Sequence, residues 1–302
     1  MKQWMANGCL LLAALIWGFA FVAQSVGMDY VGPFTFQAAR NLLGAVALLP
    51  LVFLFARQKQ KAGMRTTTAQ KRLQLKAGIL CGLALCLASN LQQIGIGYTT
   101  VGKAGFITSM YLVLVPVFGI FLRQRVPGKI WFCVMMAAFG LYLLSITEAL
   151  TFAKGDLIIL GAAVAFAGHI LIIDHYAPKV DGVLLSCTQF LVTGIGSGIL
   201  MFLFETPTLS SLLDAWLPIA YAGILSCGGG YTLQILGQKY AKPTTACLLM
   251  SLESVFSLLA GIVLLHQIPT LRESAGCVLM FAAVLLAQLP VFEGKRDKVH
   301  QS

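Results

Sequence analysis

Three ionisable side chains of this sequence lie inside long apolar stretches: Arg40, His169 and Glu253. An arginine in such a place can hold a carboxylate with two parallel hydrogen bonds, and a glutamate or histidine can take up and release a proton. A charge in hydrocarbon costs at least about 2.5 kcal/mol, so such groups face a cavity or a partner. A structural alternative stands beside this reading. In this alternative, Arg40 and Glu253 compensate each other's charge or cap broken helix ends, and His169 stabilises the bundle or only lines a cavity.

Other polar and aromatic residues recur at helical spacing in the same stretches, so that each set shares one helix face. Between such faces a small amphipathic solute would fit, and hydrogen bonding between helices is the alternative. The predicted substrate pathway comprises Trp17, Gln37, Arg40, Asn90, Gln93, Tyr111, His169 and Glu253. Glu253 and His169 are the predicted proton-coupling residues.

Two positions are expected to bend helices. Pro116 lies in the middle of an apolar stretch, where it deletes one backbone hydrogen bond. Gly229 is the central residue of three consecutive glycines. Both are predicted pivots of a conformational change, with a role in helix shape alone as the alternative.

The stretches that carry these residues predict an all-α integral membrane protein. Only 11% of the 302 residues are charged, 58% are hydrophobic and the mean hydropathy is +0.85, whereas soluble domains carry roughly 25% charged residues. Continuous apolar runs of about 20 residues match a helix that crosses a bilayer and do not alternate as barrel strands do. The ten predicted spans are residues 7–27, 32–56, 74–97, 103–123, 127–147, 156–176, 183–204, 211–237, 244–265 and 270–291.

The basic residues are unevenly placed between the two ends of these spans. All but Lys103, Lys154, Arg272 and the intrahelical Arg40 fall on the side of the N-terminus. This distribution predicts that both termini are cytoplasmic. The net charge of +10, concentrated in the predicted loop 57–76, therefore indicates contact with anionic lipid, and no nucleic-acid partner is expected.

A weak internal repeat relates the two halves of the chain. A displacement of 142 residues places Gln92 on Gln234 and Ser109 on Ser251. Because a repeat of five helices is odd-numbered, the second copy enters the membrane the other way up, an arrangement typical of carriers with a site at the midplane. The predicted units are repeats at 1–147 and 156–291 and a cytoplasmic tail at 292–302.

Several segments carry a resemblance to a known family. They are 14–22, 34–36 with Arg40, 91–95, 103–116, 236–239 with Pro243, and 251–256. Together they resemble the EamA family of the drug/metabolite transporter superfamily over nearly the whole chain. The resemblance implies a ten-helix carrier with a central cavity in a bacterial inner membrane, with both termini cytoplasmic, commonly exporting amino acids or related metabolites.

One departure from the family pattern limits what can be carried over. The family often has Gly-Glu-Arg at the end of helices 4 and 9. This sequence has Arg123-Gln124-Arg125 and His266-Gln267 at the corresponding places. No role of that glutamate is therefore assigned to this chain.

The sequence thus predicts a secondary transporter, an exporter of small organic metabolites such as amino acids, with the solute and the lipid bilayer as its partners. No Walker motif is present that would let ATP drive it directly. No nucleophile–base pair or metal-ligand spacing occurs at membrane depth, so no enzyme activity, cofactor or metal is expected. The alternative is a non-transporting membrane protein, either a channel, a sensor or an intramembrane enzyme. The oligomeric state stays open, with a homodimer among the options.

Overall fold

A computed structural model describes residues 2–62, 66–98, 101–123, 126–145, 154–265 and 270–289. These residues form helices and connections, with no strand in the ranges given. The helices up to the middle of the chain are α1 (Gln3–Gly27), α2 (Pro33–Lys61), α3 (Thr68–Ile96), α4 (Val101–Thr108), α5 (Tyr111–Phe121) and α6 (Gly128–Ser145). The remainder are α7 (Lys154–Tyr176), α8 (Gly182–Phe204), α9 (Leu209–Asp214), α10 (Trp216–Ala220), the π-helix η1 (Tyr221–Tyr231), α11 (Thr232–Gln238), α12 (Pro243–Met250), α13 (Glu253–Leu265) and α14 (Leu271–Gln288).

Eight helical stretches of the described chain are long and apolar enough to cross a membrane, and α6 contains a shorter apolar one. The chain is therefore a multi-pass membrane protein. The predicted tail at 292–302 and most of the predicted boundary between the repeats lie outside the described residues.

The predicted loop 57–76 is largely helical, which corrects the sequence-based assignment. α2 continues through Lys61, and α3 already begins at Thr68. Lysine, arginine and glutamine are good helix formers, and Lys59 and Lys61 in the last turn of α2 are favourable at a helix C-terminus. Thr67 and Gln70 close a capping box that starts α3.

Two of the predicted spans are interrupted about a third of the way from their first residue. The span predicted at 103–123 breaks at Ser109 and Met110 between α4 and α5, and the span at 244–265 breaks at Ser251 and Leu252 between α12 and α13. The two breaks are 142 residues apart, the displacement of the internal repeat. A further correction concerns 211–237: α9 is a separate short helix, and α10, η1 and α11 run on from one another.

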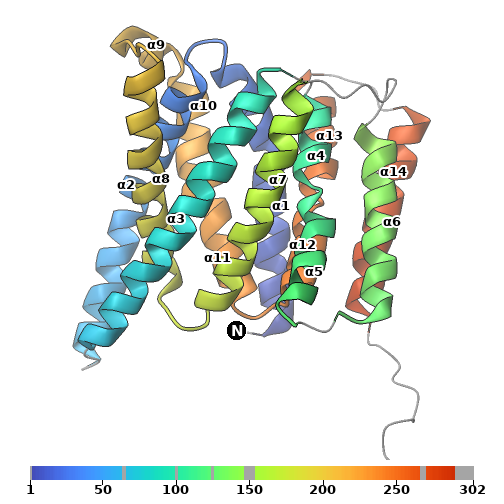
Figure 1. The fold of residues 1–302 in the computed structure, drawn as a ribbon, viewed down its shortest axis with the longest axis horizontal. Coiled ribbons are helices and arrows are strands. Elements are labelled where there is room, and N and C mark those ends of the chain that lie inside the picture. Colours follow the sequence, from blue (N-terminus) through green and yellow to red (C-terminus); the bar gives the residue numbers. More distant parts are fainter. Residues whose placement is uncertain are drawn as a thin grey trace, which may run out of the picture.

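The helices pack in pairs that join the two halves of the chain. α2 packs along α8, and α6 packs along α14 at one edge of the molecule (Figure 1). α1 packs against η1, α11, α12 and α13 of the second half, while α7 packs against α3, α4 and α5 of the first. The first helix of each half therefore lies against the helices of the other half, and the space between α1 and α7 is bounded by both.

The α2–α8 pair is linked by polar contacts at both ends. At one end the carboxylate of Glu205, directly after α8, accepts hydrogen bonds from the backbone N–H groups of Phe34 and Thr35, each at 2.8 Å. At the other end Lys59 of α2 forms an ion pair of 2.5 Å with Asp181, the N-cap of α8. This second end lies on the same side of the molecule as the N-terminus (Figure 1).

Candidate functional site

A small cavity, about 50 Å³ in volume, lies at the centre of the bundle, beside the two helix breaks. Both halves of the chain line it with polar and aromatic side chains. Five of the eight predicted pathway residues lie there: Trp17, Arg40, Tyr111, His169 and Glu253. The repeat and the helix pattern thus bring together residues that are more than 200 positions apart in the chain.

Arg40 of α2 is buried in the wall of this cavity with unsatisfied donors. Its exposed fraction is 2%, and its Nε and Nη1 atoms have no hydrogen-bond partner. The ring of Phe36 lies beneath the guanidinium at 6.0 Å. Among the described residues no carboxylate lies within 4.0 Å of Arg40, so the direct Arg40–Glu253 pair considered from the sequence is not formed. A buried charged donor without an acceptor is costly, and an anionic group entering the cavity would relieve that cost.

Glu253 opens α13 directly after the helix break. Its Oε1 atom accepts hydrogen bonds from the Tyr111 hydroxyl at 3.0 Å and from Ser109 Oγ at 3.4 Å. Ser109 also lies 3.1 Å from Ser254 Oγ. The carboxylate therefore connects the two breaks. Its place in the first turn of α13 is one where the helix dipole favours a negative charge.

Gly18 lets α1 reach this break. A Cβ atom at Gly18 would lie 2.8 Å from the backbone oxygen of Glu253 and 2.5 Å from Cβ of Phe256. Any side chain at Gly18 would therefore push α1 away from the start of α13. Glycine at this position is a packing requirement of the cavity wall.

The opposite wall of the cavity is aromatic. Trp17 and Tyr231 lie with ring centroids 4.8 Å apart, and the Trp17 indole donates to the backbone oxygen of Ser226 at 3.3 Å. The His169 ring lies edge-on to Tyr231 at 6.1 Å. Nε2 of His169 is 3.1 Å from Oε1 of Gln189, while its Nδ1 atom is buried without a partner. The imidazole therefore has one ring nitrogen engaged and one free.

The other three predicted pathway residues do not line the cavity. Gln37 donates to the backbone oxygen of Ser89 at 3.0 Å and to Oε1 of Gln93 at 3.2 Å. Asn90 donates to Ser197 Oγ at 2.8 Å. Gln37, Asn90 and Gln93 therefore join α2, α3 and α8 by hydrogen bonds, the alternative that the sequence left open for such residues.

The predicted pivots lie at different kinds of position. Pro116 is inside α5, and the helix interruption is at Ser109 and Met110 instead. The second half breaks at the equivalent place although Leu258 stands where the first half has Pro116, so proline is not what interrupts these helices. Gly229 lies within η1, whose wider π-helical winding is of the kind often found at functional sites.

Sequence reasoning left several polar residues of the cavity out of the predicted site. They are Gln92, Ser226, Tyr231 and Gln234. Gln24 and Thr108, which lie at helical spacing from Trp17 and Tyr111 in the sequence, also line the cavity. The internal repeat contained a signal for two of them, since Gln92 and Gln234 are equivalent under the displacement of 142 residues and both line the cavity. The described part of the chain holds no cluster of three or more potential metal ligands.

Comparison with known proteins identifies the architecture. The family model described as "EamA-like transporter family" matches residues 4–146 and again residues 153–289. An "Uncharacterized transporter" of Archaeoglobus fulgidus is 29% identical over 296 residues, which cover 96% of this chain and 88% of that protein. The "Uncharacterized transporter YoaV" of Bacillus subtilis is 21% identical over 286 residues, covering 92% and 94%. A solved structure titled "Crystal structure of protein" aligns with a TM-score of 0.75 at 19% identity, covering 94% and 96%, and shares the fold.

Proposed function

Because this chain belongs to the EamA-like transporter family, a family within the drug/metabolite transporter superfamily, we propose that it is a secondary transporter that exports small organic metabolites such as amino acids across a bacterial inner membrane. The observation that carries the proposal is the buried guanidinium of Arg40, which offers two unpaired N–H donor positions to a central cavity. A cavity with a charged donor and no resident partner suits a small anionic group that arrives and leaves.

The proposed architecture has ten transmembrane helices in two inverted five-helix repeats at 1–147 and 156–291. In this assignment α4 with α5, η1 with its flanking helices, and α12 with α13 each form one broken or irregular span. Two observations support it: the breaks lie one repeat apart, and α1 and α7 each pack against the opposite half. The charge distribution supports cytoplasmic placement of both termini and of the tail 292–302.

The proposed solute bears a carboxylate and an amphipathic body. Arg40 would hold the carboxylate through its Nε and Nη1 donors, since a guanidinium matches a carboxylate in two-point geometry. Trp17 and Tyr231 would cover the apolar part of the solute. The amides of Gln92 and Gln234 would supply neutral donors and acceptors from the two repeats.

The proposed driving force is a proton gradient acting through Glu253, with His169 as a second proton site. Glu253 shares the cavity with Arg40 without pairing with it, so one carboxylate can respond to protons while the guanidinium holds solute. Alternating access would separate and rejoin the two repeats at the paired breaks, with Pro116 and Gly229 as pivots. Midplane breaks in both repeats are a recurring feature of such carriers.

Solute counterflow in liposomes tests the transporter assignment and the role of Arg40 together. Purified protein is reconstituted with one unlabelled solute inside and the labelled solute outside, over amino acids, nucleobases, sugars and cationic drugs. Saturable accumulation of one amino-acid class that Arg40→Ala abolishes is the expected result. Arg57→Ala, at an exposed position of the same helix, is the matched control. Accumulation that Arg40→Ala leaves unchanged would overturn the assignment of Arg40.

A further inference from the structure

A second, broader pocket opens at the end of the molecule that carries Lys59 and Asp181. It lies between the last turns of α2, the first turns of α3, the connection from α7 to α8, and the end of α11. Its lining and that of the central cavity have no residue in common. Asp181 is the one carboxylate among its lining residues. Four lysines also line it: Lys59, Lys71, Lys179 and Lys239.

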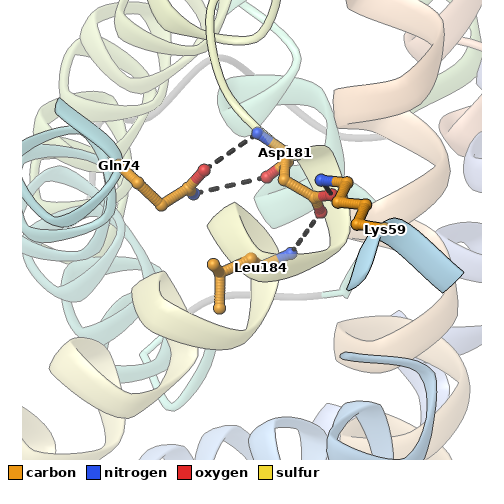
Figure 2. A network of polar contacts seen from close by, with 4 residues as sticks. All are labelled: Lys59, Gln74, Asp181 and Leu184. Atoms are coloured by element: carbon orange, nitrogen blue, oxygen red, sulfur yellow. Dashed lines mark hydrogen bonds and ion pairs between the residues drawn. The ribbon is translucent and has the colours of Figure 1, made fainter. Parts of the chain in front are cut away.

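Asp181 is already occupied by partners within the protein (Figure 2). Its Oδ2 atom pairs with Lys59 at 2.5 Å, and Oδ1 accepts the N–H of Leu184 at 3.0 Å. The Gln74 side chain holds the Asp181 backbone on both sides, accepting from its N–H at 2.8 Å and donating to its oxygen at 3.3 Å. One lysine is thereby neutralised, and the single negative charge of Asp181 does not balance the other three.

The remaining three lysines reach the pocket from three segments without an acidic partner. Among the described residues, neither Lys71, Lys179 nor Lys239 lies within 4.0 Å of a carboxylate. Lys179 contacts His175, with Nζ 2.9 Å from Nε2, and Lys239 lies over the ring of Tyr240. Neither contact supplies a negative charge. Three like charges around one hollow are stabilised by an anion placed among them.

The same pocket has an apolar rim on the outside of the bundle. Phe55, Leu75 and Leu184 line it and have exposed fractions of 40%, 57% and 37%. These three side chains come from α2, α3 and α8, so the rim is shared by the helices that carry the polar network. Exposed apolar side chains on a membrane protein contact acyl chains, whereas a soluble anion gains nothing from them. The pocket therefore suits a ligand with an anionic head and a hydrophobic body.

We infer that this pocket binds the phosphate headgroup of an anionic glycerophospholipid, held by Lys71, Lys179 and Lys239, with its acyl chains against Phe55, Leu75 and Leu184. The inference uses the proposed cytoplasmic placement of this end, where anionic lipids and basic residues meet. Lysine acts here as a point charge on phosphate. The α2–α8 contact through Lys59 and Asp181 forms the floor beside the headgroup, so lipid binding stabilises the pairing of these two helices.

Titration of the purified full-length protein with short-chain lipids tests this inference. Dioctanoyl phosphatidylglycerol in an uncharged detergent is expected to raise the Tm, because a ligand that binds the folded state stabilises it. Dioctanoyl phosphatidylcholine is expected to have no such effect. The variant Lys179→Gln/Lys239→Gln is expected to bind phosphatidylglycerol about thirty-fold more weakly, since each lysine contributes about 1 kcal/mol and 1.4 kcal/mol is a factor of ten.

A matched pair of basic residues separates this site from general surface charge. Arg57 and Arg72 lie on the same ends of α2 and α3 but do not line the pocket. Arg57→Gln/Arg72→Gln removes the same charge and is expected to keep the wild-type response. Lys179→Arg/Lys239→Arg, which keeps the charge, is also expected to bind.

Three results would overturn the inference. They are equal Tm shifts with the two lipids, equal loss in the Arg57/Arg72 control, and binding of glycerol 3-phosphate as tight as that of phosphatidylglycerol, which would assign the pocket to soluble phosphates. None of these readouts depends on transport, so a failure of the lipid site is distinguishable from a failure of the proposed carrier activity. Labelling of Gln60→Cys from outside intact cells would overturn the cytoplasmic placement by itself.

Discussion

The Tyr111 hydroxyl donates a 3.0 Å hydrogen bond to the carboxylate of Glu253, and the two residues occupy equivalent positions of the internal repeat, 142 residues apart. Residues that are equivalent in two repeats and also touch lie near the axis that relates them. Each stands two positions beyond a break, after Ser109 and after Ser251. A rearrangement of the halves that moves one break relative to the other therefore changes this bond directly.

Replacement of Glu253 by glutamine is expected to separate proton coupling from solute exchange. Glutamine keeps the shape of the side chain and an acceptor for the Tyr111 hydroxyl but cannot take up a proton at neutral pH. We expect accumulation driven by an imposed pH gradient to be abolished, while counterflow at equal pH continues. The measurement is uptake of the labelled solute into proteoliposomes with and without the gradient.

The control for Glu253 is Asp214→Asn, at the exposed end of α9. It removes a carboxylate that does not line the cavity and should leave both activities intact. Gradient-driven accumulation that survives in Glu253→Gln would remove Glu253 from the coupling mechanism. Loss of both activities in a folded variant would assign it to solute binding or to the structure of the break.

Replacement of Arg40 by lysine should weaken solute binding without removing the positive charge. Lysine cannot reproduce the two-point geometry of the guanidinium, and a hydrogen bond to a charged group contributes about 1.5–3 kcal/mol. The apparent affinity in counterflow is therefore expected to fall by about ten- to a hundred-fold. Concentration series for wild type, Arg40→Lys and Arg40→Ala measure it, and an unchanged affinity in Arg40→Lys would contradict two-point binding.

The helices and much of the cavity could be predicted from the sequence because apolar length is a strong signal in a membrane protein. Arg40, His169 and Glu253 stand out from the sequence because a charge at membrane depth is costly. Neutral residues such as Ser226 and Tyr231 carry no such signal, since hydroxyl groups occur throughout apolar helices. Their place in the cavity depends on how neighbouring helices rotate and cross.

The helix breaks show a second limit of sequence reasoning. Pro116 was the visible irregularity, yet the helix turns at Ser109 and Met110, where neither residue is a helix breaker. The repeat offered the better guide, because the same break recurs at Ser251 and Leu252 without a proline. Similarly, Gln37 and Gln93 are polar residues at helical spacing, but they hydrogen-bond to each other between α2 and α3. Spacing alone does not distinguish that arrangement from a cavity wall.

The ion pair between Asp181 and Lys59 predicts a specific dependence of stability on pH. Asp181 lies outside the membrane-spanning helices. Burial raises the pKa of its carboxyl, but the hydrogen bonds from Lys59 and the Leu184 N–H lower that pKa by more than burial raises it. The pKa of Asp181 is therefore below its usual value. A lowered pKa in the folded state stabilises the protein above the unfolded value of about 3.9, and this stabilisation is lost as the pH falls through the folded value.

The matching measurement compares the free energy of unfolding of wild type with that of Asp181→Asn over pH. Asparagine keeps the N-cap of α8, so the difference reports the charge alone. We expect a constant difference of about 0.2–1 kcal/mol from pH 8 to 5, as for a partly exposed ion pair, which disappears below about pH 4. Lys71 and Lys179 line the same pocket but do not pair with Asp181. A difference that vanished between pH 8 and 6 would contradict this assignment.

Glu205 is expected to stabilise the opposite end of the α2–α8 pair. Its carboxylate accepts the backbone N–H groups of Phe34 and Thr35 and the Thr35 hydroxyl, and thereby caps α2 from the end of α8. A side chain that caps a helix N-terminus contributes roughly 0.5–2 kcal/mol, and the negative charge adds a favourable interaction with the helix dipole.

Glu205→Ala should therefore lower the free energy of unfolding by roughly 2 kcal/mol, at the upper end of the range for helix caps, and Glu205→Gln by less, because an amide oxygen can still accept one of these bonds. Thermal unfolding of the purified variants, with Asp214→Asn as the exposed carboxylate on the same side, measures the effect. Counterflow of the Glu205 variants adds a functional readout. If the α2–α8 pair must stay together during transport, the rate falls with the Tm. A destabilised variant with an unchanged rate would show that this end of the pair opens without consequence for the cycle.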